Sequence, residues 1–392
     1  MTLVDIISNG GLLCDGDWIE KKDQDVRGKV RLIQLADIGD GEFKDKSSKY
    51  ITLETAERLH CTFLEKGDIL IARLPEPLGR ACIFPLEGAY ITAVDIAILR
   101  IKDISINPQY IMYLINSSTF RSQIKQYESG TTRKRISRKN LEKIEFSLPN
   151  LEIQNRIVAR IEELFSELDK AIDTLKTTKE QLEVYRQAVL KDAFACITEY
   201  VPFGKIISSR LGKMLDKQKN VGVPCKYLRN INVRWFSFDL SDLLDMKIEE
   251  KEFEKYTICK NDLVICEGGE PGRCAVWEKD ETIFYQKALH RVRFTIKAEP
   301  RFYMYYLWYI TQSGSINKFY TGTGIKHLTG QSLEKIPVPI TDIKEQKRLL
   351  ELIEMRLFVC DNIEKTVDAA LAQADAMRQS ILKQAFEAEK KV

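Results

Sequence analysis

Residues 186–194 read RQAVLKDAF, and residues 378–386 read RQSILKQAF, which is nearly the same stretch displaced by 192 positions. The displacement holds without a gap when residues 107–194 are aligned with residues 299–386, and 25 of these 88 positions are identical. Unrelated sequences of ordinary composition would share roughly 5 of them. The chain therefore contains two copies of one unit.

The first part of each copy corresponds more loosely than the last part. LEKGDILIAR at 64–73 matches ICKNDLVICE at 258–267, and GRACIF from Gly79 matches GRCAVW from Gly272. The offset drifts by one or two residues between these matches. Divergence is therefore concentrated in the N-terminal part of each unit.

Each copy ends in a stretch with the pattern of a coiled-coil helix. Apolar residues alternate at spacings of four and three over 157–189 and over 349–381, with one polar exception in each stretch. Neither stretch contains Pro or Gly, so each can form a helix of about 45 residues, or roughly 65 Å. Because the two seams match in length and spacing, we predict that the helices pack on each other in antiparallel orientation within the chain. The expected interface residues are Ile161, Leu164, Leu168, Leu175, Leu182, Ile353, Ile363, Val367, Met377 and Ile381.

The remaining sequence predicts an α+β fold. Residues 1–149 and 199–341 contain short apolar runs broken by Gly and Pro, and each has one helical pattern after an NP or EP dipeptide. We therefore expect two α+β domains over these ranges. A long helix follows each domain, over residues 150–198 and 342–392.

The composition gives no sign of a disulfide-rich, metal-binding or membrane-spanning protein. The chain has 392 residues, of which 44% are hydrophobic, and its net charge of +3 neither requires nor excludes a nucleic-acid partner. Nine cysteines and three histidines lack the spacing of a disulfide framework or a metal site. No export signal or membrane-spanning run is evident, so we expect a protein of the reducing cytoplasm without membrane contact.

Candidate catalytic motifs are explained by the duplication. NPQY at 107–110 and YTGTG at 320–324 resemble the catalytic and cofactor motifs of amino-methyltransferases. The other copy has EPRF and ESGTT at these positions, so both strings are elements of the repeated scaffold. Asn107 and Pro108 are better interpreted as a helix N-cap followed by Pro in the first turn. Since P-loop and nucleophile-elbow sequences are also absent, we expect no catalytic residue in this chain.

Basic residues are clustered in both copies. Residues 121–143 contain eight Lys or Arg against two acids, and residues 205–234 contain eight against one. Such patches on both domains suit a polyanion held at two places, although a chain with 30% charged residues also forms clusters of solvated charges by chance. The candidate DNA-binding residues are Arg80, Arg133, Lys134, Arg135, Arg138, Lys139, Lys213, Lys217, Lys219, Arg229, Arg273, Lys326 and His327.

Two loops occupy equivalent positions in the copies, at 129–139 and 321–331, and each precedes the repeated LEKI. Their residues differ at several matched positions, such as Arg135 and His327, so the loops are candidates for reading different bases. The alternative interpretation is that both loops only shape the turn before the next element. The shared Gly130 and Gly322 fit either interpretation.

The junction between each domain and its helix carries a resemblance to a known family. It reads IEFSLPNLEIQNRIVARI at 144–161 and IPVPITDIKEQKRLLELI at 336–353. Together with two divergent domains and two similar helices, this resembles the specificity subunit of Type I restriction-modification enzymes, whose junction typically reads IPLPPLxEQxRI. The first copy departs from that pattern at Asn150 and Ile153, and the second departs at Thr341.

The resemblance implies a division of labour between chains. Each variable domain reads one half of a bipartite, asymmetric target in double-stranded DNA, and the helix pair sets the spacer and docks two methyltransferase subunits. S-adenosylmethionine, ATP with Mg²⁺ and DNA cleavage would belong to partner subunits, and the use of restriction subunits stays open. The alternative function is a coiled-coil scaffold that assembles proteins without contacting DNA.

Overall fold

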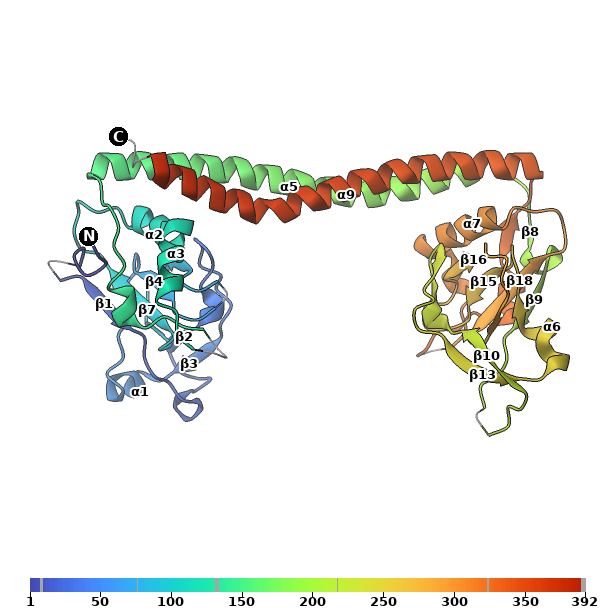
Figure 1. Ribbon diagram of the computed structural model, residues 1–392, viewed down its shortest axis with the longest axis horizontal. Coiled ribbons are helices and arrows are strands. Elements are labelled where there is room, and N and C mark those ends of the chain that lie inside the picture. The colour runs from blue at the N-terminus through green and yellow to red at the C-terminus, as the bar shows by residue number, and fades with distance from the viewer. Residues whose placement is uncertain (8–9, 76, 131–133, 217, 323, 389–392) are drawn as a thin grey trace. The chain divides into compact units, whose positions relative to one another are not determined.

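The computed structural model describes residues 1–7, 10–75, 77–130, 134–216, 218–322 and 324–388 (Figure 1). The chain divides into two compact units. Unit 1 contains residues 1–174 and the chain from 370 onward, and unit 2 contains residues 175–369. We call the part of unit 1 before the first long helix lobe 1, and the part of unit 2 between the two long helices lobe 2.

The core of lobe 1 is a four-stranded antiparallel sheet of order β1-β7-β4-β5. Alternate residues of its central strand face two hydrophobic cores: Ile69 and Ile71 face one, and Leu70 and Ala72 face the other. A second, three-stranded sheet has the order β3-β2-β6. The strands of the two sheets are β1 Leu12–Asp15, β2 Val30–Ile33, β3 Lys49–Ile51, β4 Ile69–Ala72, β5 Ala81–Ile83, β6 Tyr90–Thr92 and β7 Ile96–Arg100.

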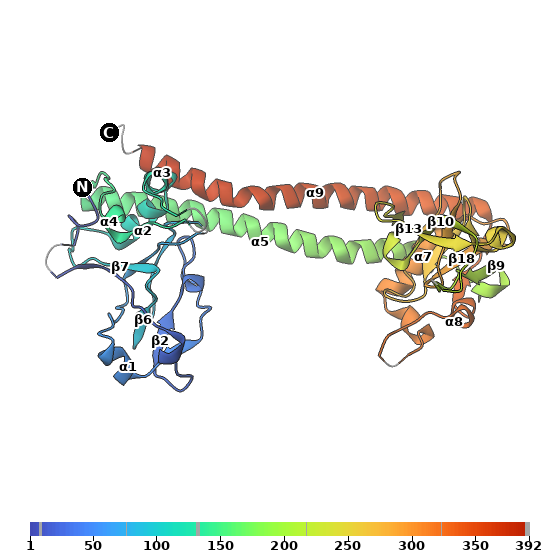
Figure 2. The same ribbon diagram turned by 60° about the horizontal axis from the view of Figure 1, so that its bottom comes forward.

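Helices cover one face of the main sheet in lobe 1. α2 and α3 lie between the sheet and the first long helix, whereas α1 and β2 lie on the opposite side of unit 1 (Figures 1 and 2). The side chain of Asn107 accepts hydrogen bonds from the backbone N–H groups of Gln109, at 2.8 Å, and Tyr110, at 3.3 Å, and Pro108 opens α2. The expected N-cap is thus confirmed. The helices of lobe 1 are η1 Lys21–Asp23, η2 Leu35–Asp37, α1 Leu53–Arg58, α2 Pro108–Asn116, α3 Ser118–Gln126 and α4 Arg138–Leu141.

Lobe 2 repeats this plan with a different sequence. Its main sheet has the order β16-β15-β18-β9, which matches β5-β4-β7-β1 strand for strand, and a second sheet has the order β13-β10-β17-β14. Its strands are β8 Tyr200–Pro202, β9 Ile207–Leu211, β10 Val223–Leu228, β11 Val233–Arg234, β12 Ser237–Phe238, β13 Leu244–Ile248, β14 Thr257–Ile258, β15 Leu263–Cys266, β16 Cys274–Val276, β17 Ile283–Tyr285, β18 Leu289–Phe294 and β19 Pro337–Pro339. Its helices are η3 Phe203–Lys205, η4 Asn230–Asn232, η5 Glu250–Glu252, α6 Phe253–Tyr256, α7 Pro300–Gln312, η6 Ser315–Phe319 and α8 Gly330–Glu334.

The long helices are α5 (Leu151–Ala195) and α9 (Ile343–Ala388). In unit 1 the beginning of α5 packs with the end of α9, and in unit 2 the end of α5 packs with the beginning of α9. The helices therefore run antiparallel. The predicted fold class, two α+β domains that are each followed by a long helix in an internal duplication, is confirmed.

The seam between the helices departs from a strict heptad pattern. Ile161, Leu168, Leu182, Ile353 and Val367 are buried, and Leu164, Leu175 and Ile381 are half-buried. Ile363 and Met377, expected in the seam, are instead 41% and 50% exposed.

At both positions the charged residue that comes next in the chain contacts the partner helix instead. Glu364 accepts a hydrogen bond from Arg186 in unit 2, and Arg378 pairs with Asp169 in unit 1. An α-helix has 3.6 residues per turn, whereas apolar residues in a heptad pattern recur every 3.5 residues on average. Over many turns such a stripe therefore drifts around the helix unless the helices supercoil. The next residue along the chain then faces the partner helix.

The end of each long helix packs on a lobe. In unit 1, the ring of Phe386 lies 5.4 Å from that of Tyr110 on α2. In unit 2, Phe194 makes the corresponding contacts with Phe302 and Tyr306 on α7, at 5.4 and 5.2 Å. The repeated stretch RQxxLKxAF is therefore the part of each helix that docks on the globular core.

A buried glutamine fixes the start of each long helix. The side-chain oxygen of Gln154 accepts a hydrogen bond from the backbone N–H of Asn107, at 2.8 Å, and that of Gln346 accepts one from Glu299, at 2.9 Å. Their amide groups donate to the carbonyls of Pro149 and Thr341, at 2.8 and 2.9 Å. The glutamine of the junction motif thus ties α5 to α2 and α9 to α7.

Candidate nucleic-acid interface

Four segments meet at one end of the main sheet of lobe 1. The backbone N–H of Ile136 donates to the carbonyl of Arg73, at 3.1 Å, and the N–H of Arg73 donates to Asp95, at 2.9 Å. Asp17 forms a parallel bridge with Ala93. We call the described residues of 16–18, 73–79, 93–95 and 129–138 sheet end 1.

Lobe 2 builds the same arrangement. The N–H of Leu328 donates to the carbonyl of Glu267, at 2.7 Å, and the N–H of Glu267 donates to Ala288, at 2.9 Å. Lys213 forms a parallel bridge with Gln286, as Asp17 does with Ala93. The described residues of 212–214, 267–273, 286–288 and 321–330 form sheet end 2.

Each sheet end carries a small hairpin with the same hydrogen bonds. Ser129 and Arg135 exchange two backbone hydrogen bonds of 2.9 Å, and Thr321 and His327 do the same. Gly130 and Gly322 follow the first hairpin residue with φ of 98° and 96°, a conformation that favours glycine. The described parts of the two loops thus share these backbone hydrogen bonds and the left-handed glycine, and they differ in their side chains.

The side chains of the hairpins reach solvent. Arg135, Lys326 and His327 are exposed, and the ammonium group of Lys326 lies 5.8 Å from the centre of the Tyr320 ring. Lys134 is exposed and pairs with Glu128. Arg133 lies outside the described residues.

Two further candidates of lobe 1 lie on α4. Ser137 caps this helix by accepting a hydrogen bond of 3.2 Å from the N–H of Asn140. Arg138 pairs with Glu142, the residue that follows α4, and lies 3.6 Å from Asp15, so its charge is partly neutralised. Lys139 is exposed.

The side chains of Arg80 and Arg273 bond to groups inside the protein and are not free to contact DNA. Arg80 is only 8% exposed and donates to the carbonyls of Leu35 and Ile38, at 2.9 and 2.8 Å. Arg273 donates to the carbonyl of Asn230 at 2.9 Å and pairs with Glu270 at 2.7 Å. Both side chains hold a neighbouring loop in place, because a buried guanidinium must find acceptors inside the protein.

The second basic cluster is largely neutralised. Lys213 is mostly covered and pairs with Glu252, and this hydrogen bond lowers the pKa of Glu252. Arg229 pairs with Asp242 at 2.6 Å. The side chain of Lys219 is 86% exposed, and Lys217 lies outside the described residues. Among the three candidates of this cluster that the structure describes, Lys219 is the one with an ammonium group in solvent, 3.8 Å from Asp216.

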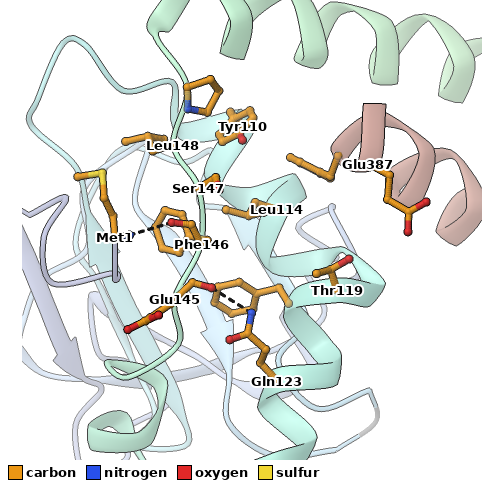
Figure 3. Close-up of a pocket in the computed structure, with 13 residues that line it drawn as sticks. Met1, Tyr110, Leu114, Thr119, Gln123, Glu145, Phe146, Ser147, Leu148 and Glu387 are labelled. Carbon is orange, nitrogen blue, oxygen red and sulfur yellow. Dashed lines mark hydrogen bonds between the residues drawn. The ribbon is translucent and has the colours of Figure 1, made fainter. Parts of the chain in front are cut away.

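Two hollows in the described part of unit 1 lie close to these segments, and residues of α9 contribute to the lining of both. One of about 570 Å³ lies beside sheet end 1, where Pro75, Pro77 and Lys134 contribute to its lining. The other, of about 460 Å³, lies where α2, α3 and the segment before α5 meet the end of α9 (Figure 3). The N-terminal ammonium group of Met1 donates to the carbonyl of Phe146 beside this second hollow, at 2.9 Å.

The described residues include no group of three or more His, Cys, Asp or Glu side chains placed to hold a metal ion. Among the helices that the structure describes, none has the length and apolar character needed to cross a membrane.

The sheet ends could not be derived from the sequence, because their segments are distant along the chain. The hairpins were identified from the repeat, whereas the exposed residues Trp18 and Met214, which directly follow the bridge residues Asp17 and Lys213, carry no basic charge and were not singled out. The signal that could have found them is a shared Gly followed two positions later by a large apolar residue, Gly16 with Trp18 and Gly212 with Met214.

Comparison with known proteins gives a consistent result. The family model described as "Type I restriction modification DNA specificity domain" matches residues 11–184 and 230–372. The chain is 24% identical over 301 residues to the Type I restriction enzyme EcoKI specificity subunit of Escherichia coli (strain K12), an alignment that spans 71% of this chain and 65% of that relative. It is also 24% identical over 309 residues to the StySPI specificity subunit of Salmonella potsdam, spanning 72% of this chain and 66% of that relative.

Two solved structures share the fold. A chain from a structure of a type I R-M system superposes with a TM-score of 0.68 at 15% identity, covering 97% of this chain and 98% of that one. The HsdS subunit from Thermoanaerobacter tengcongensis superposes with a TM-score of 0.61 at 15% identity, covering 97% of each chain. At this level of identity, the similarity concerns the fold alone.

Proposed function

Because the chain belongs to the family of Type I restriction modification DNA specificity domains, we propose that it is the DNA-recognition subunit of a Type I restriction-modification complex. It recognises the target sequence in DNA, and methylation and cleavage take place on partner subunits. S-adenosylmethionine, and ATP with Mg²⁺ where a restriction subunit takes part, are cofactors of those partners.

The observation that carries this proposal is the pair of equivalent sheet ends. A common hairpin frame displays Arg135 in lobe 1 and His327 in lobe 2. Arginine can donate two hydrogen bonds to the edge of guanine, whereas a neutral imidazole offers one donor and one acceptor. One scaffold therefore presents two different reading surfaces, which suits an asymmetric target with two half-sites.

The domain boundaries follow the same proposal. Residues 1–149 and 199–341 are the target-recognition domains, and residues 150–198 and 342–392 are the spacer helices. The continuous helix α5 joins the first domain to the second along the chain. Its length sets the number of base pairs between the half-sites.

An apolar stripe on α9 supports the docking of protein partners. Met355, Phe358 and Val359 are 60%, 65% and 52% exposed in unit 2, on the face opposite to the buried Ile353 and Leu357. Contiguous apolar surface of this kind marks an interaction site. Methyltransferase subunits, two per chain, occupy the helix pair, and restriction subunits join where the system uses them.

Selection from random duplex DNA tests the proposal. The chain is purified together with its partner methyltransferase, and the bound duplexes are recovered and sequenced over several rounds. The expected result is a bipartite sequence with two different half-sites and a fixed spacer. Recovery of sequences without any shared pattern, from a complex that is assembled and monodisperse, would contradict a recognition role and favour a scaffold.

A further inference from the structure

We propose that Trp18 in lobe 1 and Met214 in lobe 2 are apolar wedges that pack against or between the bases of their half-sites. This inference rests on the proposed function and deepens it, because it adds a pair of base-contacting residues that carry no charge. Trp18 and Met214 belong to two loops at equivalent places of the lobes, residues 16–28 and the described part of 212–222.

A glycine pins the beginning of each loop against the neighbouring backbone. A Cβ atom on Gly16 would lie 2.3 Å from the carbonyl oxygen of Ala93, and one on Gly212 would lie 2.3 Å from that of Gln286. A side chain at either position would therefore clash with the main chain. The next residue is also fixed, because the N–H of Asp17 donates to Thr92 at 2.8 Å and that of Lys213 donates to Tyr285 at 3.0 Å.

The end of each loop is held in a similar way. A Cβ atom on Gly28 would lie 2.2 Å from the carbonyl oxygen of Ile51, and one on Gly222 would lie 2.1 Å from that of Ile248. Both loops are thus anchored at two points against their second sheet. Anchoring lowers the entropy that a protruding side chain loses when it binds.

The residue two positions after the first glycine is large, apolar and exposed in both lobes. Trp18 is 71% exposed and Met214 is 59% exposed. Further along the loops, Val26 and Val221 are 95% and 56% exposed. Two copies that have diverged strongly in this region still place an exposed apolar side chain at the same point, which indicates a common task.

The wedges lie on the proposed DNA-binding surfaces. Asp17 forms a bridge with Ala93, in the turn whose Asp95 carbonyl accepts a hydrogen bond from the N–H of Arg73. The carbonyl of Arg73 accepts one from the N–H of Ile136, which follows the hairpin of sheet end 1. Lys213 bridges to the corresponding turn of sheet end 2. A base that is contacted by a hairpin can therefore have a wedge as its neighbour.

The chemistry of the first loop favours bases over the phosphate backbone. Acidic residues outnumber basic ones in the loop 16–28, which contains Lys21, Lys22 and Arg27 together with Asp17, Glu20, Asp23 and Asp25. A purely electrostatic contact with phosphates is thus not favoured at this loop, whereas an indole ring has a flat face on which a base can stack. Methionine is among the apolar residues that proteins insert between base steps.

The test uses the complex of the full chain with its methyltransferase and a duplex obtained by selection from random DNA. 2-Aminopurine replaces each base of one half-site in turn, because its fluorescence reports unstacking. Trp18→Ala is expected to weaken binding by about tenfold or more and to abolish the fluorescence change in the first half-site only. Met214→Ala is expected to act on the second half-site only, and Trp18→Phe is expected to retain most of the affinity.

Ile104→Ala is the matched control, because Ile104 is 93% exposed in lobe 1 and belongs to neither sheet end. Unchanged affinity and fluorescence in both Ala variants would overturn the inference, provided that the unmodified complex binds its selected duplex. Loss of methyltransferase assembly instead of base contact would also overturn it, because the loops would then bind protein. If the unmodified complex binds all duplexes alike, the proposed function itself fails.

Discussion

Arg186 on α5 donates a hydrogen bond of 2.6 Å to Asp361 on α9, and the two residues are 175 positions apart in the chain. It donates a second hydrogen bond, of 2.9 Å, to Glu364. In unit 1 the repeat equivalents of the first pair, Arg378 and Asp169, are also paired. The duplication has therefore preserved one interhelical ion pair in each unit, beside the apolar seam that includes the buried Leu168 and Cys360.

Replacing Arg186 with Ala is expected to lower the stability of unit 2. The Arg186 side chain is only 10% exposed and bonds to Asp361 and Glu364 on α9 as well as to Glu183 on its own helix. Its loss would remove both of these bonds between the helices, although Glu364 also lies 3.7 Å from Lys179. We expect a loss of about 1–2 kcal/mol, since the carboxylates stay partly solvated. Thermal unfolding measures the change.

Arg160→Ala is the control for this prediction, because Arg160 pairs with Glu163 on the solvent side of α5. Its effect should stay within about 0.5 kcal/mol. Equal effects of the two substitutions would show that the Arg186 pair does not hold the helices together.

Replacing Gln346 with Leu is expected to destabilise the junction of lobe 2 and α9. Gln346 is fully buried and bonds to the backbone of Glu299 and Thr341. A Leu side chain fills the space but leaves an N–H and a carbonyl without partners, at a cost of about 3 kcal/mol. Gln109→Leu on the exposed side of α2 should have little effect, and a similarly small effect of Gln346→Leu in thermal unfolding would refute the assigned role.

The stability of the protein should depend on pH through Asp17. Burial raises the pKa of Asp17 to about 6 from its ordinary 3.8, although Thr62 donates a hydrogen bond of 3.1 Å to its carboxylate. Because this pKa is higher in the folded state, folding is penalised as pH rises from about 4 to 6, and the penalty is constant above that range.

Asp17→Asn removes this penalty. We expect a gain of about 1–2 kcal/mol at pH 7, after allowance for solvent screening, and no gain at pH 4. Unfolding midpoints of both proteins across this pH range measure the difference. A gain of equal size at both pH values would show that Asp17 titrates in its ordinary range.

A charge in the apolar stripe of α9 is expected to block partner assembly without unfolding the chain. Phe358 is 65% exposed, so Phe358→Asp places the carboxylate in water in the free protein but buries it in a complex. Copurification with the methyltransferase should fall by at least about tenfold. Ala372→Asp, at an exposed position of the same helix, should leave assembly intact, and normal assembly of Phe358→Asp would remove the stripe from the docking surface.

The sequence predicted the features that depend on local pattern. The repeat at RQxxLKxAF and the absence of Pro and Gly predicted the two long helices, and Asn107 with Pro108 predicted the start of α2. Features that depend on tertiary packing were missed. The GR dipeptides at Arg80 and Arg273 read as basic loop residues, but their burial depends on carbonyl groups more than 40 positions away.

The seam of the long helices shows the same limit. Ile363 and Met377 satisfy the heptad spacing, yet charged residues next to them face the partner helix because an ion pair replaces the apolar contact. Pairing of charges between distant segments cannot be read from spacing alone. The two sheet ends are likewise assembled from segments that only the strand order brings together.

The most direct test of the central claim is the affinity of the chain with its methyltransferase for a selected duplex whose first or second half-site has been scrambled. Our account predicts that each scrambling weakens binding in the unmodified complex. Arg135→Ala should lose about 1–3 kcal/mol of binding free energy on the intact target, and scrambling the first half-site should then weaken binding less than it does in the unmodified complex. His327→Ala should show the same reduced response to scrambling of the second half-site. Each variant should keep its normal response to scrambling of the other half-site. If both variants respond to both scrambled duplexes as the unmodified complex does, the sheet ends do not read DNA.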